Sequence, residues 1–239
     1  MIEKINLNNI LFLDIETVPE VADFNTLDDE MKALWDQKTL YQRKDDFTPE
    51  EFYDRAGIWA EFGKIVCISV GYFIIKGDIR NFRVTSFFGE EKQLLKDFSN
   101  LINNHFNQPQ HVLCGHNAKE FDIPFLARRM IINQMPIPDK LNLFGKKPWE
   151  IPHLDTLELW KFGDYKHFTS LKLLCKVLGI PSSKGDIDGS QVGHVFYVEK
   201  DIDRIVTYCE KDTIAVAQIF LRLRREDLDR KSTRLNSSH

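Results

Sequence analysis

Apolar positions in the first half of the chain follow a pattern typical of strands. The run Ile10–Glu16, continuously apolar at first and alternating at its end, predicts a strand with a buried start. β-branched and aromatic residues predict two further strands at Ile65–Phe73 and Arg83–Phe88. Short connections join these last two segments, so the pattern predicts a meander of about three strands.

The second half of the chain is mainly helical in its pattern. Apolar residues at helical spacing predict a helix over Glu90–Phe106, and His111–Cys114 predicts the next strand. Further helices are predicted at Phe125–Ile132, Leu154–Phe162, Ser170–Leu178 and about Asp201–Arg225. Together with the meander, this order predicts an α/β fold with a mixed central sheet and helices on both faces.

Two regions depart from this pattern. Residues 20–62 are polar and helix-prone, with candidate helices near 28–37 and 49–62, so we interpret them as an insertion. Residues 1–225 are then expected to form a single domain around it. Residues 226–239 end in KSTRLNSSH, which is polar and without periodicity, so we expect a disordered tail or a sequencing scar there.

Composition narrows the class of protein only moderately. The chain has 239 residues and 43% apolar content, enough for one well-buried core, and its formal charge of -4 does not suggest a general nucleic-acid binder. Its four cysteines form no C-x-x-C pair, which favours a reducing, cytoplasmic setting. The N-terminus is polar where a signal peptide would be apolar, and no apolar run is long enough to span a membrane. We therefore expect neither export nor a membrane partner.

Carboxylates at the end of the first predicted strand are the first candidate for chemistry. In LFLDIETV, Asp14 and Glu16 are two residues apart, so on a strand they point to the same face. A solvated pair at the strand exit is one interpretation. The other is a divalent cation between them, since Mg²⁺ and Mn²⁺ prefer carboxylate oxygens.

Two later motifs add acids and an aromatic residue. In GHNAKEFDIP, Asn117 suits a turn, and Asp122 precedes Ile123-Pro124 as a plausible helix N-cap. In YCEKD, Tyr208 and Asp212 are four residues apart and project from one side of the last helix. Asp155 in HLDTLELW is expected to cap a helix.

Taken together, D-x-E, N-x-x-x-F-D and Y-x-x-x-D resemble the tyrosine branch of the DEDD (DnaQ-like) superfamily of 3′→5′ exonucleases. The segments ISVGYF, GHNAKEFDIPFL and SLKLLCKVLGI followed by KGDIDG are similar to the exonuclease domain of family B DNA polymerases. The resemblance covers about residues 10–222. It implies a ribonuclease-H-like fold, and because the chain ends soon after the third motif, a stand-alone exonuclease.

The resemblance also implies roles for individual residues. Two Mg²⁺ or Mn²⁺ ions would be held by four acids, with Tyr208 and Glu16 positioning the attacking water. The metal-holding acids would be Asp14, Glu16, Asp122 and Asp212. The 3′-terminal nucleotide would contact Thr17, Asn117 and Phe121, and we expect Lys184 to touch the phosphate backbone. The substrate would be single-stranded DNA, with RNA as an alternative, and any replication or repair partner is not identified.

Other functions fit fewer of these residues. The histidine branch would need a histidine where this chain has Thr207. A haloacid-dehalogenase-type phosphatase would use Asp14 as a covalent nucleophile. It would leave Asn117, Asp122, Tyr208 and Asp212 unexplained. A catalytically quiet nucleic-acid-binding module is the remaining alternative, against which the complete set of acids argues.

Overall fold

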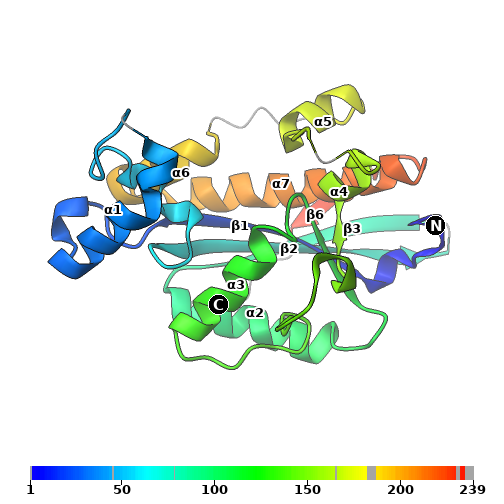
Figure 1. Cartoon of the computed structure of the whole chain (residues 1–239). Helices are drawn as coiled ribbons and strands as arrows, with labels where there is room; N and C mark the ends of the chain where they lie inside the picture. The colour runs from blue at the N-terminus through cyan, green and yellow to red at the C-terminus, as the bar shows by residue number, and fades with distance from the viewer. Residues whose placement is uncertain are drawn as a thin grey trace.

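The computed structural model describes residues 2–44, 46–77, 79–164, 166–181 and 187–229, and the backbone of residues 232–234. Within these residues the strands form one six-stranded sheet in the order β5–β4–β1–β2–β3–β6 (Figure 1). The strands are β1 (Ile10–Pro19), β2 (Gly63–Lys76), β3 (Ile79–Phe88), β4 (Val112–Gly115), β5 (Leu154–Asp155) and β6 (Ser232–Arg234).

Strand directions divide the sheet into two halves. β1, β2 and β3 are antiparallel neighbours, whereas β4 runs parallel to β1 and β5 runs parallel to β4. The predicted meander and the mixed α/β sheet are therefore confirmed. β1 has a partner on each side, and within it only Asp14 and Thr17 are partly exposed to solvent, while its other residues are buried.

Helices cover both faces of the sheet. Figure 1 shows α7 on one side and α2 with α3 on the other. Leu13 and Ile15 of β1 pack under α2 and α3, while Phe12 and Val18 pack under α7. The helices are α1 (Asp29–Arg43), α2 (Glu91–His105), α3 (Asp122–Ile132), α4 (Thr156–Lys161), α5 (Leu171–Val177), α6 (Val192–His194) and α7 (Ile202–Leu223).

Shorter helical segments connect these elements. Six described segments are 3-10 turns and one, Val195–Glu199, is a π-helical turn. The 3-10 turns are Ile2–Lys4, Leu7–Asn9, Phe24–Thr26, Tyr53–Ile58, Pro148–Glu150 and Gly189–Gln191. The helix predicted near residues 49–62 is therefore wrong in type, because this stretch contains Gly57 and its aromatic residues turn inward around Trp35.

Two of the described strands escaped prediction: β5, and β6 in the segment expected to be a disordered tail. The helix expected from Leu154 begins only at Thr156, because Leu154–Asp155 pairs with β4 as the edge strand β5. Two residues are too few to show a strand period. The predicted starts of α2, α5 and α7 are correct to within a residue, and Ser170 caps α5 while Asp201 caps α7. The helix predicted from Phe125 begins three residues earlier, at Asp122.

Residues 20–62 form a small aromatic core beside the end of β1. Trp35 of α1 is fully buried, and its indole nitrogen donates to Pro49 O at 2.8 Å. The rings of Tyr53 and Phe62 pack edge-on against it, with centroids 5.4 and 5.1 Å away. The insertion is thus a folded part of the molecule with its own apolar cluster.

Two glycines let this insertion dock closely on β1. A Cβ at Gly63 would lie 2.8 Å from Gly57 Cα, and a Cβ at Gly57 would lie 3.0 Å from the Val18 carbonyl carbon. The Thr17 hydroxyl donates to Gly57 O at 2.7 Å. Larger residues at either glycine would push the insertion away from the strand that carries Asp14 and Glu16.

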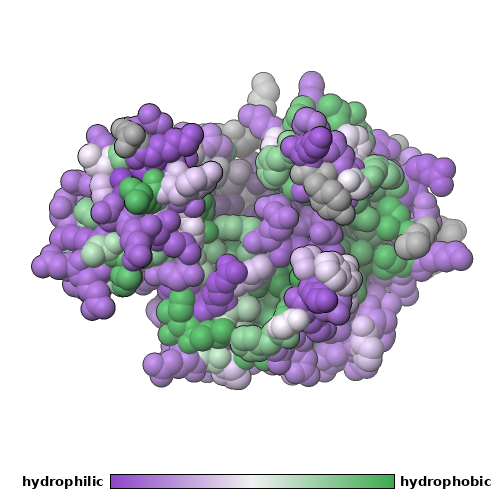
Figure 2. Space-filling model, viewed as in Figure 1, coloured by the Kyte–Doolittle hydropathy of each residue, from purple (hydrophilic) through white to green (hydrophobic). Residues whose placement is uncertain are grey.

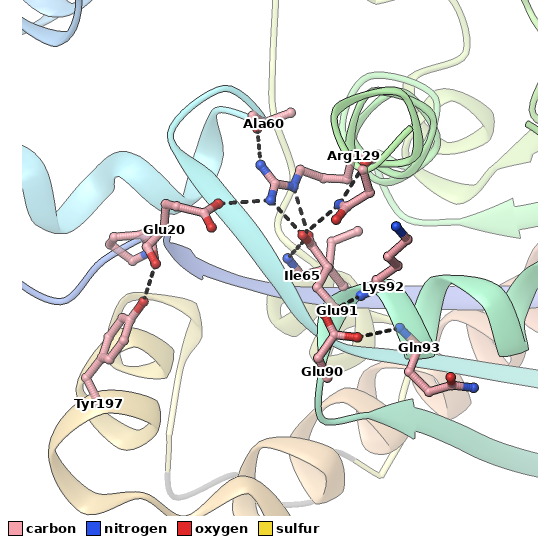
Figure 3. A network of polar contacts seen from close by, with 11 residues as sticks. Glu20, Ala60, Ile65, Glu90, Glu91, Lys92, Gln93, Arg129 and Tyr197 are labelled. Atoms are coloured by element: carbon pink, nitrogen blue, oxygen red, sulfur yellow. Dashed lines mark hydrogen bonds and ion pairs between the residues drawn. The ribbon is translucent and has the colours of Figure 1, made fainter. Parts of the chain in front are cut away.

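A buried arginine ties the insertion to the main body (Figure 3). Arg129 of α3 is 4% exposed, and its guanidinium pairs with Glu91 of α2 at 2.6 Å and with Glu20 at 2.9 Å. It also donates to Ala60 O at 2.9 Å, while Glu91 accepts from Ile65 N at 2.8 Å. One charged network therefore joins α2, α3, β2 and both ends of the insertion.

The last described residues return to the sheet. Arg80 of β3 pairs with Glu226 at 2.5 Å, and Asp229 Oδ2 accepts from Phe82 N at 3.1 Å. The backbone of β6 pairs in parallel with β3. This part of the predicted tail lies against the sheet. Separately, none of the helices in the described ranges is long and apolar enough to span a bilayer.

The surface is hollowed between the insertion and the part built from α4 and α5. Figure 2 shows this recess, with apolar and polar residues mixed on its walls, in the same view as Figure 1. The middle of α7 passes behind it in Figure 1. The end of β1 and the centre of α7 carry candidate acids: Asp14 and Glu16 on β1, and Asp212 on α7.

Candidate active site

Asp14 and Glu16 interrupt an otherwise apolar face of β1. Phe12, two residues before Asp14, packs edge-on against Phe220 of α7 with centroids 5.8 Å apart. Val18, two residues after Glu16, lies in a second apolar cluster under α7. Strand alternation directs the two acids to this same face, so they fill a polar gap between two hydrophobic clusters.

Helix α7 covers this gap with polar residues of its own. The thiol of Cys209 donates to Asp14 O at 3.3 Å and to Asp14 Oδ2 at 3.4 Å. Asp212 follows Tyr208 by one helical turn, and the two side chains shift each other's pKa. Helical spacing therefore brings Tyr208 and Asp212 together on the side of α7 that crosses β1.

Asp122 joins the group from the start of α3, but not as the helix cap that the sequence predicts. The structure makes Asp122 the first helical residue and Phe121 the N-cap, which gives no side-chain capping bond. Asp122 is 4% exposed, and its Oδ1 accepts from Ile15 N of β1 at 3.1 Å. The prediction was wrong because the carboxylate bonds a distant strand instead of its own helix.

The four acids affect one another electrostatically. Burial raises the pKa of Asp14 well above its usual value, and the charges of Glu16, Asp122 and Asp212 raise it further. Burial and the charge of Asp212 likewise raise the pKa of Glu16, which is 8% exposed. The hydrogen bonds of Asp122 to Ile15 N and of Cys209 to Asp14 bring the start of α3 and the middle of α7 to β1, so three separate chain segments meet here.

The other two acids are partly relieved by hydrogen bonds. Burial raises the pKa of Asp122 to about 7, although the backbone N–H groups of Asp122 and Ile15 oppose the shift. Burial raises the pKa of Asp212 to about 6, against the hydrogen bond from Tyr208 and the charge of Lys211. Among the described residues, none of the four acids forms an ion pair.

This donor set fits hard divalent cations. It offers carboxylate oxygens, the ligands that Mg²⁺ and Mn²⁺ prefer, and a surplus of buried negative charge that cations would neutralise. Ligand atoms of Asp14, Glu16 and Cys209 all lie within 4.8 Å of one another. The arrangement can therefore hold cations in contact with residues from β1 and α7.

Three of the four predicted substrate contacts fall among the described residues. Asn117 adopts a left-handed backbone conformation, φ 64°, in the turn that leads to Phe121. Phe121 packs against Phe125 with centroids 5.4 Å apart. The Thr17 hydroxyl donates its hydrogen to Gly57 O. Lys184 lies outside the described residues.

A pocket of about 770 Å³ opens beside the acids, between α5 and α7. Tyr208 and Asp212 form part of its wall, and the cations Lys172 and Lys211 line it too. Leu171 and Ile214 contribute apolar surface. Aromatic, apolar and positively charged groups next to buried acids suit a ligand that carries both rings and phosphates.

Comparison with known proteins places the chain in a family. Residues 58–236 match the model of a family described as predicted 3′–5′ exonucleases related to the exonuclease domain of PolB. The chain belongs to this family. The matched range contains Asp122, Tyr208 and Asp212, while Asp14 and Glu16 precede it.

The chain also shares its fold with solved structures. The family B DNA polymerase from the hyperthermophilic archaeon Pyrobaculum calidifontis aligns with a TM-score of 0.52 and 16% identity, over 89% of this chain. The aligned part is 24% of the polymerase, so this chain spans about a quarter of its length. At this identity the likeness shows the fold, which is the predicted ribonuclease-H-like one. No curated protein sequence matches the chain.

Asp155 does more in this fold than sequence reasoning assigned to it. As predicted, it caps α4, accepting from Leu157 N at 2.9 Å. The same 2%-exposed carboxylate accepts from Asn117 N at 2.9 Å and Lys119 N at 3.0 Å. Asp155 therefore shapes the turn before Asp122, a contact across nearly forty residues that no local pattern reveals.

Cys209 is the second residue that sequence reasoning missed. It stands between the two motif residues Tyr208 and Asp212, and its apolar helical position predicted only core packing. Its thiol instead touches Asp14. Only the crossing of α7 over β1 makes this contact, although the position next to Tyr208 was a signal that could have drawn attention.

Proposed function

We propose that this protein is a metal-dependent 3′→5′ exonuclease of the tyrosine DEDD type. It removes nucleoside 5′-monophosphates from the 3′ ends of single-stranded nucleic acid, with DNA preferred. The observation that carries the proposal is the convergence of buried acids from β1, α3 and α7 with no described ion-pair partner. Membership in a family of predicted 3′–5′ exonucleases supports the same activity.

Asp14, Glu16, Asp122 and Asp212 would hold two Mg²⁺ or Mn²⁺ ions. Bound there, such ions supply a water of lowered pKa and stabilise negative charge on the scissile phosphate and the leaving 3′ oxygen. In their absence, the raised pKa values of these acids oppose full ionisation. Metal binding and ionisation of the site are therefore expected to be coupled.

Tyr208 and Glu16 would orient the attacking water. Burial and the charge of Asp212 raise the pKa of Tyr208, so the phenol stays protonated at neutral pH. Tyr208 therefore acts through hydrogen bonds rather than as a base. It lines the same pocket as Asp212, one helical turn away.

The pocket between α5 and α7 would receive the strand. Lys172 and Lys211 line it and can face phosphates without forming part of the acidic cluster. Thr17, Asn117 and Phe121 would contact the terminal nucleotide, with the Thr17 hydroxyl acting as an acceptor because its hydrogen is used on Gly57. Lys184 would contact the backbone. The preference for DNA rests on the likeness to family B polymerases.

The test is a digestion time course with 5′-labelled single strands of DNA and RNA of matched sequence. The wild type is compared with Asp14→Ala and with Glu120→Ala, an exposed acid two residues before Asp122 that serves as a control. We expect a descending ladder only with Mg²⁺ or Mn²⁺, faster on DNA, lost in Asp14→Ala and retained in Glu120→Ala.

Three other outcomes of this digestion would change the proposed function. Faster loss of RNA would replace the DNA preference by an exoribonuclease activity. Strand binding without cleavage in any metal, from a folded wild type, would favour the quiet binding module. Full activity in Asp14→Ala would remove the proposed site.

A further inference from the structure

The acidic cluster contains a ligand that Mg²⁺ chemistry does not use. Cys209 Sγ lies 3.4 Å from Asp14 Oδ2, and it belongs with Asp14 and Glu16 to one group of ligand atoms no more than 4.8 Å apart. Magnesium binds through oxygen, whereas thiol sulfur is a ligand for softer ions such as zinc. The site therefore offers two kinds of coordination in one place.

A second thiol borders the first. Cys67 of β2 stands opposite Glu16 in the strand register, and it belongs with Cys209 to one buried cluster. Residues opposite one another on neighbouring strands direct their side chains to the same face. Two buried thiols from β2 and α7 therefore adjoin the two carboxylates of β1, so Cys209 is not an isolated sulfur.

The spacing agrees with coordination by zinc. With bonds of about 2.0 Å to oxygen and about 2.3 Å to sulfur, those two ligand atoms lie about 3.5 Å apart around a tetrahedral zinc ion. The Cys209 Sγ to Asp14 Oδ2 separation of 3.4 Å already has this value. Glu16 offers a third ligand atom within 4.8 Å of the other two.

We propose that Asp14, Glu16 and Cys209 form a thiol-containing site for a thiophilic divalent cation such as Zn²⁺ or Cd²⁺, with Cys67 beside it. Binding replaces the S–H bond of Cys209 by a sulfur–metal bond and releases the proton to water, with no oxidation or reduction. Because Asp14 and Glu16 are shared, such an ion excludes Mg²⁺ from them. Inhibition of cleavage rests on the proposed function, but the binding site itself does not.

Binding is tested by titrating the metal-free protein with Cd²⁺ and recording the ultraviolet charge-transfer band of cadmium thiolates. The matched variants are Cys209→Ala and Cys114→Ala, since both thiols are fully buried and Cys114 lies in a separate apolar cluster. We expect a band at one equivalent in the wild type and in Cys114→Ala. In Cys209→Ala the band should be lost and the affinity should fall about tenfold or more.

The wild type alone can overturn the proposal. If no band develops with excess Cd²⁺, the thiol does not bind, whatever the variants do. An unchanged band and affinity in a folded Cys209→Ala would also contradict it. Circular dichroism and thermal melting of each variant establish that the fold is retained.

A second arm separates this proposal from the exonuclease itself. Zn²⁺ is added to Mg²⁺-supported digestions, and each variant is compared with its own rate before zinc is added. Cys209→Ala should need about tenfold more Zn²⁺ for half inhibition than Cys114→Ala. A cadmium band without any nuclease activity would support the thiol-containing metal site and contradict the proposed exonuclease function. Cleavage without a cadmium band would support the exonuclease function and contradict the thiol-containing site.

Discussion

Two clusters of buried charge lie within this fold and differ in how their charges are balanced. In the first, Arg129 pairs with Glu91 and Glu20 and also donates to a backbone carbonyl (Figure 3). Burial alone would lower the pKa of Arg129, but the hydrogen bonds and charges of the two glutamates raise it overall. Each group in this network has its partners within the protein.

In the second cluster, acids face other acids. Burial and mutual repulsion raise the pKa values of Asp14 and Glu16, and burial raises those of Asp122 and Asp212. Buried charges without a partner destabilise a fold unless a bound ion compensates them. The contrast indicates that the Arg129 network stabilises the structure, whereas the carboxylate cluster is suited to binding a cation.

The largest expected effect is on catalysis at the carboxylate cluster. Asp14→Asn should lower the cleavage rate about a thousandfold, since a lost metal ligand removes several kcal/mol of transition-state stabilisation. The same change removes a repelled charge, so the metal-free variant should melt no lower than the wild type. Digestion rates and thermal melting measure the two effects. Normal cleavage, or a strong loss of stability, would make Asp14 a structural residue.

At the Arg129 network, the expected effect is on stability instead of catalysis. Arg129→Met should lower the free energy of unfolding by about 3 to 5 kcal/mol, because it leaves Glu91 buried without its cation. Arg128→Met, at the exposed neighbouring position, is the control and should change stability little. Denaturant unfolding of both variants measures this. Equal stabilities would mean that the Arg129 network does not hold the helices together.

A smaller effect is expected for the tyrosine. Tyr208→Phe removes the hydroxyl proposed to orient the attacking water and should slow turnover about a hundredfold, while leaving metal affinity nearly unchanged. Tyr197→Phe is the matched control, since its hydroxyl donates to Pro19 O at 2.5 Å, away from the acids. Single-turnover rates and metal titrations distinguish the two. An unaltered rate in Tyr208→Phe would exclude the tyrosine from the mechanism.

The smallest expected effect is on stability and depends on pH. The pKa of Asp122 rises from 3.8 to about 7 on folding, so its ionisation destabilises the fold increasingly as pH rises from about 4 to above 7. Asp122→Asn keeps the acceptor for Ile15 N without the charge. Metal-free Asp122→Asn should therefore melt a few degrees higher than the wild type at pH 8, and the difference should shrink by pH 5.

Added Mg²⁺ serves as the control for this prediction. It should raise the melting temperature of the wild type more than that of Asp122→Asn, because only the wild type gains a cation for that charge. A variant that melts below the wild type at pH 8 would show that the carboxylate is already compensated within the protein.

Much of this fold could be predicted because its signals are local. Apolar runs marked β1, β2 and β3, and helical periodicity marked α2 and α7. What escaped prediction depended on distant partners. The strand β5 exists only beside β4, and Asp122 gives up its expected capping role because Ile15 N lies within reach.

The sequence by itself determined which residues carry the candidate chemistry. The order of Asp14, Glu16, Asp122, Tyr208 and Asp212, with strand and helix spacing around them, was enough to nominate a metal-dependent site. Spacing within a strand or helix is a property of the backbone, so it can be read without the fold.

Only the tertiary structure decided how those residues meet and what else meets them. The contact of Cys209 with Asp14 spans 195 residues, and the bonds of Asp155 to the Asn117 turn span 38. Burial and repulsion, which set the pKa values of the acids, likewise arise only when α7 covers β1. Such effects depend on distances in space, and a pattern along the chain does not contain them.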